Sequence, residues 1–372
     1  MRLDGKVVAE ASVFVLSEIR ALATKETMNQ NSHRSACLLS LIAIACIASS
    51  TPLARAGEAS LVPQTFPLAD ATALAVTGGK GEPVEYLGRK AIRLTTDKES
   101  DIFAFVNGTA IQDGTIDVDI AVKITTPPGV RMPGFTGIAF RARPDGSHYD
   151  MFYLRPRNSL SDDQAMRNHS VQYVGKPGFD WYPLRRQWPS VYESWADLEP
   201  EKWAHVKIEL HGRSARLFVN GSDHASLVVN GLKGEDLQGG IALWGSPGEE
   251  SYFSNLRVTP EKPEPIHNGG EAAGIWSVTF GSDYGKFTGT MDLHRDGTVI
   301  RGSWSGAFGN NRSITGTWRD GYVQLTFSGQ WEDPNPGPVT ATMAGWIDGD
   351  NATGRMKAEG RADGIWTAER KK

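Results

Sequence analysis

The chain has 372 residues, of which 40% are hydrophobic and 22% are charged, and its formal net charge at pH 7 is −4. This mildly acidic balance argues against nucleic acid as a partner, because proteins that bind the phosphate backbone are usually basic. The length is large for one domain and comfortable for two.

Residues 1–56 have the pattern of an N-terminal extension and signal peptide. A weakly basic start near Arg34 precedes an apolar run over residues 36–48, and Ala54-Arg55-Ala56 provides a small-residue cleavage site before Gly57. The apolar run is shorter than the about 20 residues that are needed to cross a bilayer. We therefore expect the mature protein to be secreted or periplasmic, with no membrane span after processing.

Both cysteines, Cys37 and Cys46, lie inside this segment. Without it the chain has no cysteine, which excludes disulfides and cysteine catalysis, so each domain must be stabilised by its own core. The segment carries six Lys/Arg and four Asp/Glu, and its removal changes the formal net charge to −6.

Residues 261–273 are predicted to link two domains, because they combine proline, glycine and charge with no apolar period. The segment before them, residues 57–260, consists of short alternating runs separated by turn residues. In one of these runs Ile116, Val118 and Ile120 alternate with polar residues. About a dozen such strands and no convincing helix predict an all-β fold, an antiparallel two-sheet jelly-roll sandwich.

Residues 274–372 have a more regular rhythm of eight strand-sized segments joined by Asp-Gly turns, which predicts an eight-stranded up-and-down β-barrel. Trp276 near the start and Arg370 near the end resemble the closure of calycins, in which an arginine of the last strand covers a tryptophan of the first. The pattern leaves open whether this barrel packs its interior with side chains or holds one small ligand.

The first domain contains several runs that are typical of strands and turns. They are Asp113-Gly114-Thr115-Ile116-Asp117-Val118-Asp119, Gly137-Ile138-Ala139-Phe140-Arg141, Leu217-Phe218-Val219-Asn220-Gly221, Gly240-Ile241-Ala242-Leu243-Trp244 and Tyr252-Phe253-Ser254-Asn255-Leu256-Arg257-Val258. With these runs the domain resembles the concanavalin A-like lectin/glucanase superfamily over roughly residues 60–260. Within that superfamily, laminin-G-like modules and the 3-keto-disaccharide hydrolase-like domain are the most similar in pattern. The resemblance implies a sandwich that binds carbohydrate.

No cofactor is predicted. Relatives in this superfamily hold a structural calcium ion with aspartate and backbone oxygens, but no loop of this chain is dense enough in such ligands to require one. His148, His169 and His205 do not have the spacing of metal ligands.

A surface rich in arginine and tyrosine is predicted between residues 134 and 182. Alternation over residues 149–155 places Tyr149, Met151, Tyr153 and Arg155 on one face. A long loop with many aromatic residues is expected over residues 156–202, either as a platform for sugar rings or as a satellite core. The predicted ligand contacts are Arg141, Tyr153, Arg155, Gln172, Tyr173 and Trp181.

Carboxylates that could act on a glycosidic bond are also present. Glycoside hydrolysis needs two of them near one another, and the glucanase pattern Glu-x-Asp-x-x-Glu is absent. Each candidate has the alternative interpretation of a surface charge, and Arg141 and Arg155 could instead pair with Asp117 or Asp163. The candidate catalytic residues are Asp117, Asp119, Asp163 and Glu193.

Three classes of function follow from these patterns. The favoured one is a secreted carbohydrate-binding protein that recognises an oligo- or polysaccharide through a concave Arg/Tyr face and an aromatic loop. The alternative is a hydrolase that cleaves a 3-keto-glycoside or related glycoside with carboxylates on that face. The third is a surface protein whose sandwich binds a protein partner and whose barrel acts as a spacer.

Overall fold

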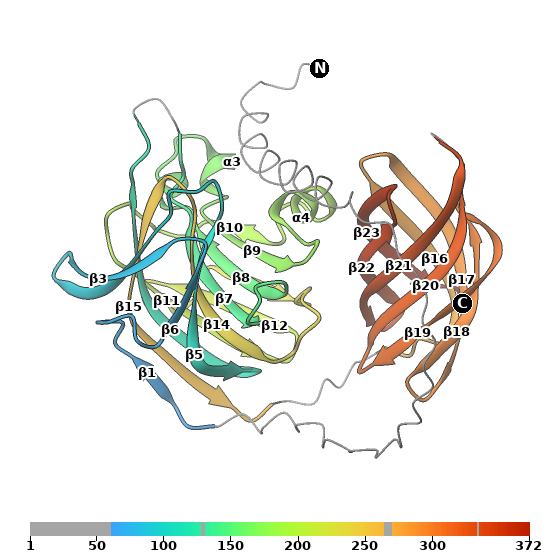
Figure 1. The fold of residues 1–372 in the computed structure, drawn as a ribbon, viewed down its shortest axis with the longest axis horizontal. Coiled ribbons are helices and arrows are strands. Elements are labelled where there is room, and N and C mark those ends of the chain that lie inside the picture. Colours follow the sequence, from blue (N-terminus) through green and yellow to red (C-terminus); the bar gives the residue numbers. More distant parts are fainter. Residues whose placement is uncertain (1–60, 128–130, 264–269, 333–334) are drawn as a thin grey trace, which may run out of the picture. The chain divides into compact units, whose positions relative to one another are not determined.

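The computed structural model describes residues 61–127, 131–263, 270–332 and 335–372. The expected signal peptide lies outside these residues. Figure 1 shows a β-sandwich followed in sequence by a β-barrel, so the predicted all-β fold is confirmed. Within the described residues, no helix has the length and apolar character needed to cross a membrane.

Two antiparallel sheets form the sandwich, and the chain passes between them several times. Sheet A has eight strands in the order β13-β12-β11-β6-β15-β4-β3, with β1 paired to β15. Its strands are β1 (Gln64–Phe66), β3 (Lys80–Tyr86), β4 (Arg89–Thr95), β6 (Asp113–Ile124), β11 (Ala204–His211), β12 (Ser214–Val219), β13 (Leu227–Asn230) and β15 (Glu249–Glu261).

Sheet B has seven strands in the order β10-β9-β8-β7-β14-β5-β2. Its central strands β7 and β14 pair with each other, and β8 pairs with both β7 and β9. Its strands are β2 (Leu74–Thr77), β5 (Ile102–Ile111), β7 (Thr136–Ala142), β8 (Tyr149–Leu154), β9 (Val171–Lys176), β10 (Glu193–Ser194) and β14 (Gly239–Gly245).

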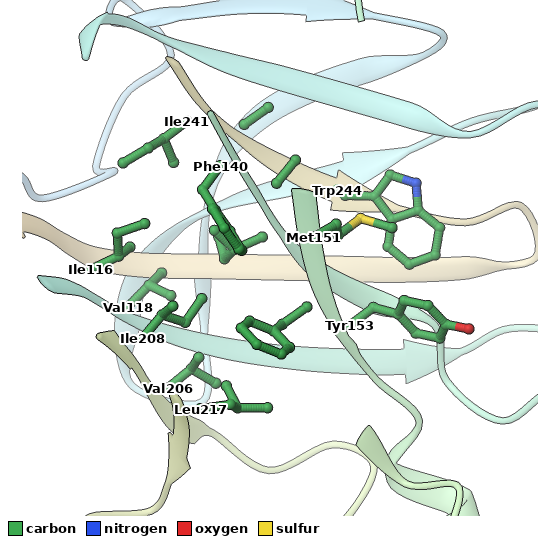
Figure 2. Close-up of a cluster of buried hydrophobic side chains, with 14 of the residues drawn as sticks. Ile116, Val118, Phe140, Met151, Tyr153, Val206, Ile208, Leu217, Ile241 and Trp244 are labelled. Atoms are coloured by element: carbon green, nitrogen blue, oxygen red, sulfur yellow. The ribbon is translucent and has the colours of Figure 1, made fainter. Parts of the chain in front are cut away.

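The sandwich core is built by the period-two alternation that the sequence shows. In β6 the side chains of Ile116 and Val118 are fully buried, and in the paired strand β11 the side chains of Val206 and Ile208 are buried beside them. Figure 2 shows these four side chains as one group on the inner side of sheet A.

The segment between β8 and β11 is more structured than the predicted loop. The expectation of one continuous loop over residues 156–202 is wrong, because β9 and β10 add two strands to the edge of sheet B. Three short helices occupy much of the remainder: α2 (Pro156–Ser159), α3 (Gln164–Arg167) and α4 (Trp181–Gln187).

The second domain is a closed barrel of eight antiparallel strands, as predicted. Each strand pairs with the next, and β16 also pairs with β23. The interior is filled by buried side chains that include Trp304, Phe308 and Phe327. The strands are β16 (Gly274–Ser282), β17 (Gly285–Asp296), β18 (Val299–Gly306), β19 (Gly309–Arg319), β20 (Tyr322–Trp331), β21 (Gly337–Asp348), β22 (Asn351–Ala358) and β23 (Ala362–Arg370).

The contact expected at the barrel closure is present. The Arg370 guanidinium lies 4.3 Å from the centre of the Trp276 ring, and the Trp276 indole donates a hydrogen bond to the Ala272 carbonyl at 2.9 Å. Arg370 also donates to the carbonyls of Glu271 and Ala273. Residues 271–273, which precede the first strand, are therefore bound to the barrel.

Candidate functional site

An aromatic layer lies on the face of sheet B opposite Ile138 and Phe152, with three of its rings buried and two, Phe103 and Phe135, partly exposed. We call it the aromatic face and define it as Phe103, Phe135, Tyr149, Tyr153 and Trp244. Its rings contact one another: the ring centres of Phe103 and Tyr149 are 5.4 Å apart, and those of Tyr153 and Trp244 are 5.5 Å apart. Phe135 lies 5.9 Å from Tyr153. Figure 2 shows Tyr153 and Trp244 side by side with Met151.

Small residues in the central strands allow this layer to form. Gly137 and Ala139 of β7 and Ala242 of β14 lie on the same face, in register with Tyr153, Met151 and each other. A Cβ atom at Gly137 would overlap the carbonyl oxygen of Phe152 and lie 2.8 Å from Cβ of Tyr153, so a larger residue there would clash with the backbone of β8. The rings of the flanking strands can therefore reach across the middle of the sheet.

A polar group adjoins the aromatic face at the outer strands of sheet B. We call it the edge cluster and define it as Arg155, His169, Gln172, Arg185 and Glu193. Gln172 and Glu193 are direct partners in the pairing of β9 with β10. Tyr153 is in turn the partner of Gln172 in β8, which places the cluster next to the aromatic face.

Glu193 is the centre of the edge cluster. Its side chain is buried, and Arg185 of α4 donates to both carboxylate oxygens, with Nη2 2.6 Å from Oε2. Arg155 Nη2 lies 3.7 Å from Oε2, and His169 Nε2 lies 3.4 Å from Oε1. Gln172 accepts a hydrogen bond from Arg155 at 3.2 Å. One carboxylate thus aligns two guanidinium groups and an imidazole.

Burial and charge set the protonation of the groups around this site. Burial, assisted by the nearby Arg185 guanidinium, lowers the pKa of His169 to about 4, so its imidazole is neutral near pH 7. Burial raises the pKa of the Tyr153 phenol to about 12, which keeps its hydroxyl protonated. At the other end of the aromatic face, burial raises the pKa of Asp101 to about 6, although Trp244 and Lys176 act in the opposite direction.

Of the aromatic residues in the segment before β11, some pack against the core and others are exposed, so both predicted roles, satellite core and platform for sugar rings, have candidates. Trp181 and Trp188 pack against the core of the sandwich, and Tyr192 is buried. Tyr182 and Trp195 remain exposed, at 50% and 47%. Trp181 is also covered by the guanidinium of Arg185, 4.8 Å from its ring centre, a contact between residues one helical turn apart in α4.

Half of the residues predicted for the site come together on this side of sheet B. Four of them lie in β8, β9, α4 and β10, and Arg155 directly follows β8; their predicted roles stay predictions. These residues are Tyr153, Arg155, Gln172, Trp181 and Glu193.

The expected place of Arg141 on the Arg/Tyr face is wrong. Its side chain is 1% exposed and donates to the carbonyls of Gln112 at 2.7 Å and Gly212 at 2.6 Å, with Asp113 at 3.4 Å. The cause is a β-bulge: Ala139 to Ala142 in β7 faces only Ala242 to Gly240 in β14. Arg141 has a positive φ of 52° there, so the alternation is broken and its guanidinium turns inward.

Tyr173 also lies outside the site. It is the partner of Phe152 in the pairing of β8 with β9, which places it on the core side of sheet B. Its hydroxyl donates to Asp150 and accepts the backbone N–H of Lys233 at 2.6 Å. Because neighbouring residues in a strand point to opposite faces, Gln172 and Tyr173 cannot contact the same ligand.

Three of the four predicted catalytic carboxylates do not converge with Glu193. Asp117 and Asp119 lie on the outer face of sheet A, opposite the buried Val118. Asp119 forms an ion pair with Arg89, lies 3.0 Å from Nδ1 of His205 and accepts a hydrogen bond from Asn255 at 2.8 Å. The expectation of one catalytic group is therefore wrong.

Asp163 has a structural role at the start of α3. Its side chain is exposed and accepts hydrogen bonds from the backbone N–H groups of Ala165 at 2.9 Å and Met166 at 3.3 Å. This is the geometry of a helix N-cap, which satisfies two N–H groups that have no partner inside the helix.

Several residues of the site were not predicted. Trp244 is in β14, which pairs with β7 only in three dimensions, Phe103 is in β5, which pairs with β14, and Phe135 directly precedes β7. Arg185 and His169 lie outside the alternating runs. A signal was present for Trp244, since it alternates with the buried Leu243 in a run that ends the sandwich. Its neighbours across the sheet are set by topology, which the run itself does not contain.

Searches with known proteins gave no match to a family model and none to a curated protein. Solved structures with similar folds include a carbohydrate binding module, CBM66, from Bacillus subtilis, at 15% identity and a TM-score of 0.36, with 50% of this chain and 96% of that chain covered. A second is a protein of unknown function with a galectin-like fold, also from Bacillus subtilis. It has 11% identity and a TM-score of 0.37, with 54% and 96% of the chains covered.

A third similar structure is the GlcNAcα1-4Gal releasing endo-β-galactosidase from Clostridium perfringens. It has 10% identity and a TM-score of 0.32, and the match covers 83% of this chain and 96% of that chain. At these identities and scores, the likenesses carry no argument about function. The chain is similar in fold to these β-sandwich proteins, and its function has to be argued from its own site.

Proposed function

We propose that this protein binds an oligo- or polysaccharide on the aromatic face and the edge cluster of sheet B. The observation that carries the proposal is that an aromatic layer on the outer side of a sheet, in which Phe103 and Phe135 are partly exposed, continues directly into aligned arginine, glutamine and glutamate side chains. Sugar rings have apolar faces that pack on aromatic rings, and they carry hydroxyl groups around their edge. The aromatic face can pack on the apolar face of a sugar ring, and the edge cluster can hydrogen-bond its hydroxyl groups.

The edge cluster supplies the hydrogen bonds in this proposal. Arg185, whose side chain is 27% exposed, and the largely buried Arg155 have N–H groups whose directions are fixed by Glu193, and a guanidinium makes stronger hydrogen bonds than a neutral group. His169 is neutral near pH 7 and can donate from one ring nitrogen and accept at the other. Such a set can orient sugar hydroxyl groups without a metal ion.

A sugar-cleaving hydrolase is the second candidate, and Asp101 is the observation that favours it. Its carboxyl has a pKa of about 6 and lies beside Trp244 at the aromatic face, so a fraction is protonated near neutral pH. A glycosidase needs one carboxylic acid to protonate the leaving oxygen and one carboxylate to attack or to activate water. In this version Asp101 acts as the acid on a glycoside such as a 3-keto-glycoside. Glu193 cannot be its partner carboxylate, because four strand steps of sheet B, about 19 Å, separate it from Trp244.

Secretion or export to the periplasm is part of the same proposal. It is supported by the signal-like pattern of residues 1–56, and an extracellular glycan is the kind of ligand that an exported protein meets. Mass spectrometry of the protein recovered from its native host would show an N-terminus at Gly57 if the proposal holds. An N-terminus at Met1 would contradict it.

The two candidate functions can be separated in one experiment. Purified protein is mixed with cello-, laminari-, xylo- and manno-oligosaccharides, oligogalacturonates and 3-keto-glycosides, and saturation-transfer and product signals are read by NMR. Saturation transfer without new anomeric signals supports binding. New product signals that disappear in Asp101→Asn support hydrolysis, and the absence of both effects for every sugar contradicts the proposal.

A further inference from the structure

Trp195 extends the proposed site beyond the edge cluster. It follows Glu193 by two residues, and burial alternates from here on, with Ala196 and Leu198 buried and Trp195 and Asp197 exposed. Extended backbone places residues i and i+2 on the same side, about 6.6 Å apart, so the Trp195 ring lies on the side of the Glu193 carboxylate.

The exposure of Trp195 is unusual for its residue type. Its side chain is 47% exposed, and within the described residues it has no ring contact, cation contact or hydrogen bond by its indole. The adjoining backbone is nevertheless fixed, because Ala196 donates to Ser170 Oγ at 2.8 Å and its carbonyl accepts from Ser159 at 2.7 Å. A large apolar ring is thus held in solvent by a well-anchored segment.

A second aromatic group is at the start of α4, the helix that Arg185 connects to Glu193. Trp181 is partly exposed under the guanidinium of Arg185, and Tyr182 next to it is 50% exposed. Arg185 reaches from this helix to Glu193, so Trp181 and Trp195 are both tied to the same carboxylate, one through Arg185 and one through two residues of backbone.

We propose that the site takes an extended glycan chain of several sugar units that runs along the edge of sheet B, with separate units on Trp181 and on Trp195. This inference rests on the proposed carbohydrate-binding function. A single sugar can use one ring and the hydrogen bonds of the edge cluster. Only a longer chain can occupy both rings at once, and each added unit then gains a stacking contact.

The test is a titration of chain length. Isothermal titration calorimetry of the full protein uses cello-, laminari- and xylo-oligosaccharides of two, four and six units. For the sugar type that binds, we expect the affinity to rise at least tenfold from the disaccharide to the hexasaccharide. Trp195→Ala should remove most of this gain and leave the affinity for the disaccharide within about twofold, whereas Trp195→Phe should retain it. Tyr284→Ala, at an exposed ring of the barrel, is the matched control.

The outcomes separate the inference from the function on which it rests. If a disaccharide binds as tightly as the hexasaccharide, or if Trp195→Ala weakens both equally, sugar binding stands and the extended chain is wrong. If no sugar of any length binds in these titrations or in the broader NMR panel, carbohydrate binding itself is wrong. Circular dichroism of Trp195→Ala shows whether a lost affinity comes from a lost fold.

Discussion

Arg185 forms a bidentate ion pair with Glu193, in which Nε lies 2.9 Å from Oε1 and Nη2 lies 2.6 Å from Oε2. The contact joins α4 to the short edge strand β10, which makes only two residue pairs with β9. A strand this short gains little from its backbone hydrogen bonds. The ion pair is therefore a main reason that α4 and β10 keep a fixed geometry at the edge of the sheet.

Glu193→Gln should weaken both the fold and the site. It removes the charge that two arginines share, in a buried position, and we expect a loss of about 2 to 4 kcal/mol in the free energy of unfolding, measured by urea denaturation. Sugar affinity should fall at least tenfold because the guanidinium groups lose their alignment. Glu199→Gln, whose carboxylate pairs with Lys202 at the exposed surface, is the control and should change neither quantity.

Trp181→Ala should abolish sugar binding at a moderate cost in stability. Its ring is partly exposed at the site but also packs against the core, so we expect a loss of about 1 to 2 kcal/mol, below the value for a fully buried tryptophan. Calorimetry and thermal melts of the same preparation measure the two effects. Unchanged affinity together with a loss above about 3 kcal/mol would show that Trp181 serves only the core.

Asp119→Asn tests the assignment of the site to sheet B. Asp119 bonds Arg89, His205 and Asn255 on the outer face of sheet A, so we expect a loss of about 1 to 2 kcal/mol in stability. Sugar affinity and any hydrolytic activity should be those of the unaltered protein. A loss of binding in a variant with an intact circular dichroism spectrum would place the sugar on sheet A.

Glu249→Gln should remove a pH dependence of stability. Burial raises the pKa of Glu249 to about 8, against the effect of the Gly134 N–H that donates to Oε1 at 2.8 Å. Between its ordinary value near 4.5 and this value the folded protein holds a proton that the unfolded chain has released. Stability therefore falls as pH rises through this window, by up to about 1.4 kcal/mol per pH unit.

Urea unfolding at intervals between pH 5 and pH 8.5 measures this slope. Asp101 and His169 titrate in part of the same window, with opposite signs, because the pKa of Asp101 is raised and that of His169 is lowered. The difference between the unaltered protein and Glu249→Gln isolates the contribution of Glu249. Equal slopes in the two proteins would show that Glu249 is ionised in the fold.

Much of the fold is contained in local alternation. Ile116 and Val118 are buried as their spacing predicts, and the eight segments between Gly274 and Arg370 all form strands of the barrel. Alternation decides which side of a strand is apolar, and a short turn decides that the next strand is antiparallel. Both properties are local, so a single sequence is sufficient to predict them.

The site depends on which sheet each strand joins, and that is not local. β6 and β7 are consecutive in the chain but belong to different sheets, so Asp119 and Tyr153 lie on opposite outer faces of the sandwich. The bulge at Arg141 is a second obstacle, because one inserted residue reverses which face the arginine occupies. The sequence around Arg141 contains no pattern that predicts the bulge. The shared face of Tyr149 and Tyr153, in contrast, follows from regular strand alternation.

The pairing of β16 with β23 also has a consequence for how the molecule is made. Every strand of the sandwich has been synthesised once Glu261 is reached, so its core can form while the rest of the chain is still absent. The barrel cannot close until its last strand has been synthesised, because β16 pairs with β23 and Trp276 is covered by Arg370 of that strand. Contacts between such distant residues form slowly. Until β23 has been made, the tryptophans and phenylalanines of the barrel interior lack the strand that completes their cover.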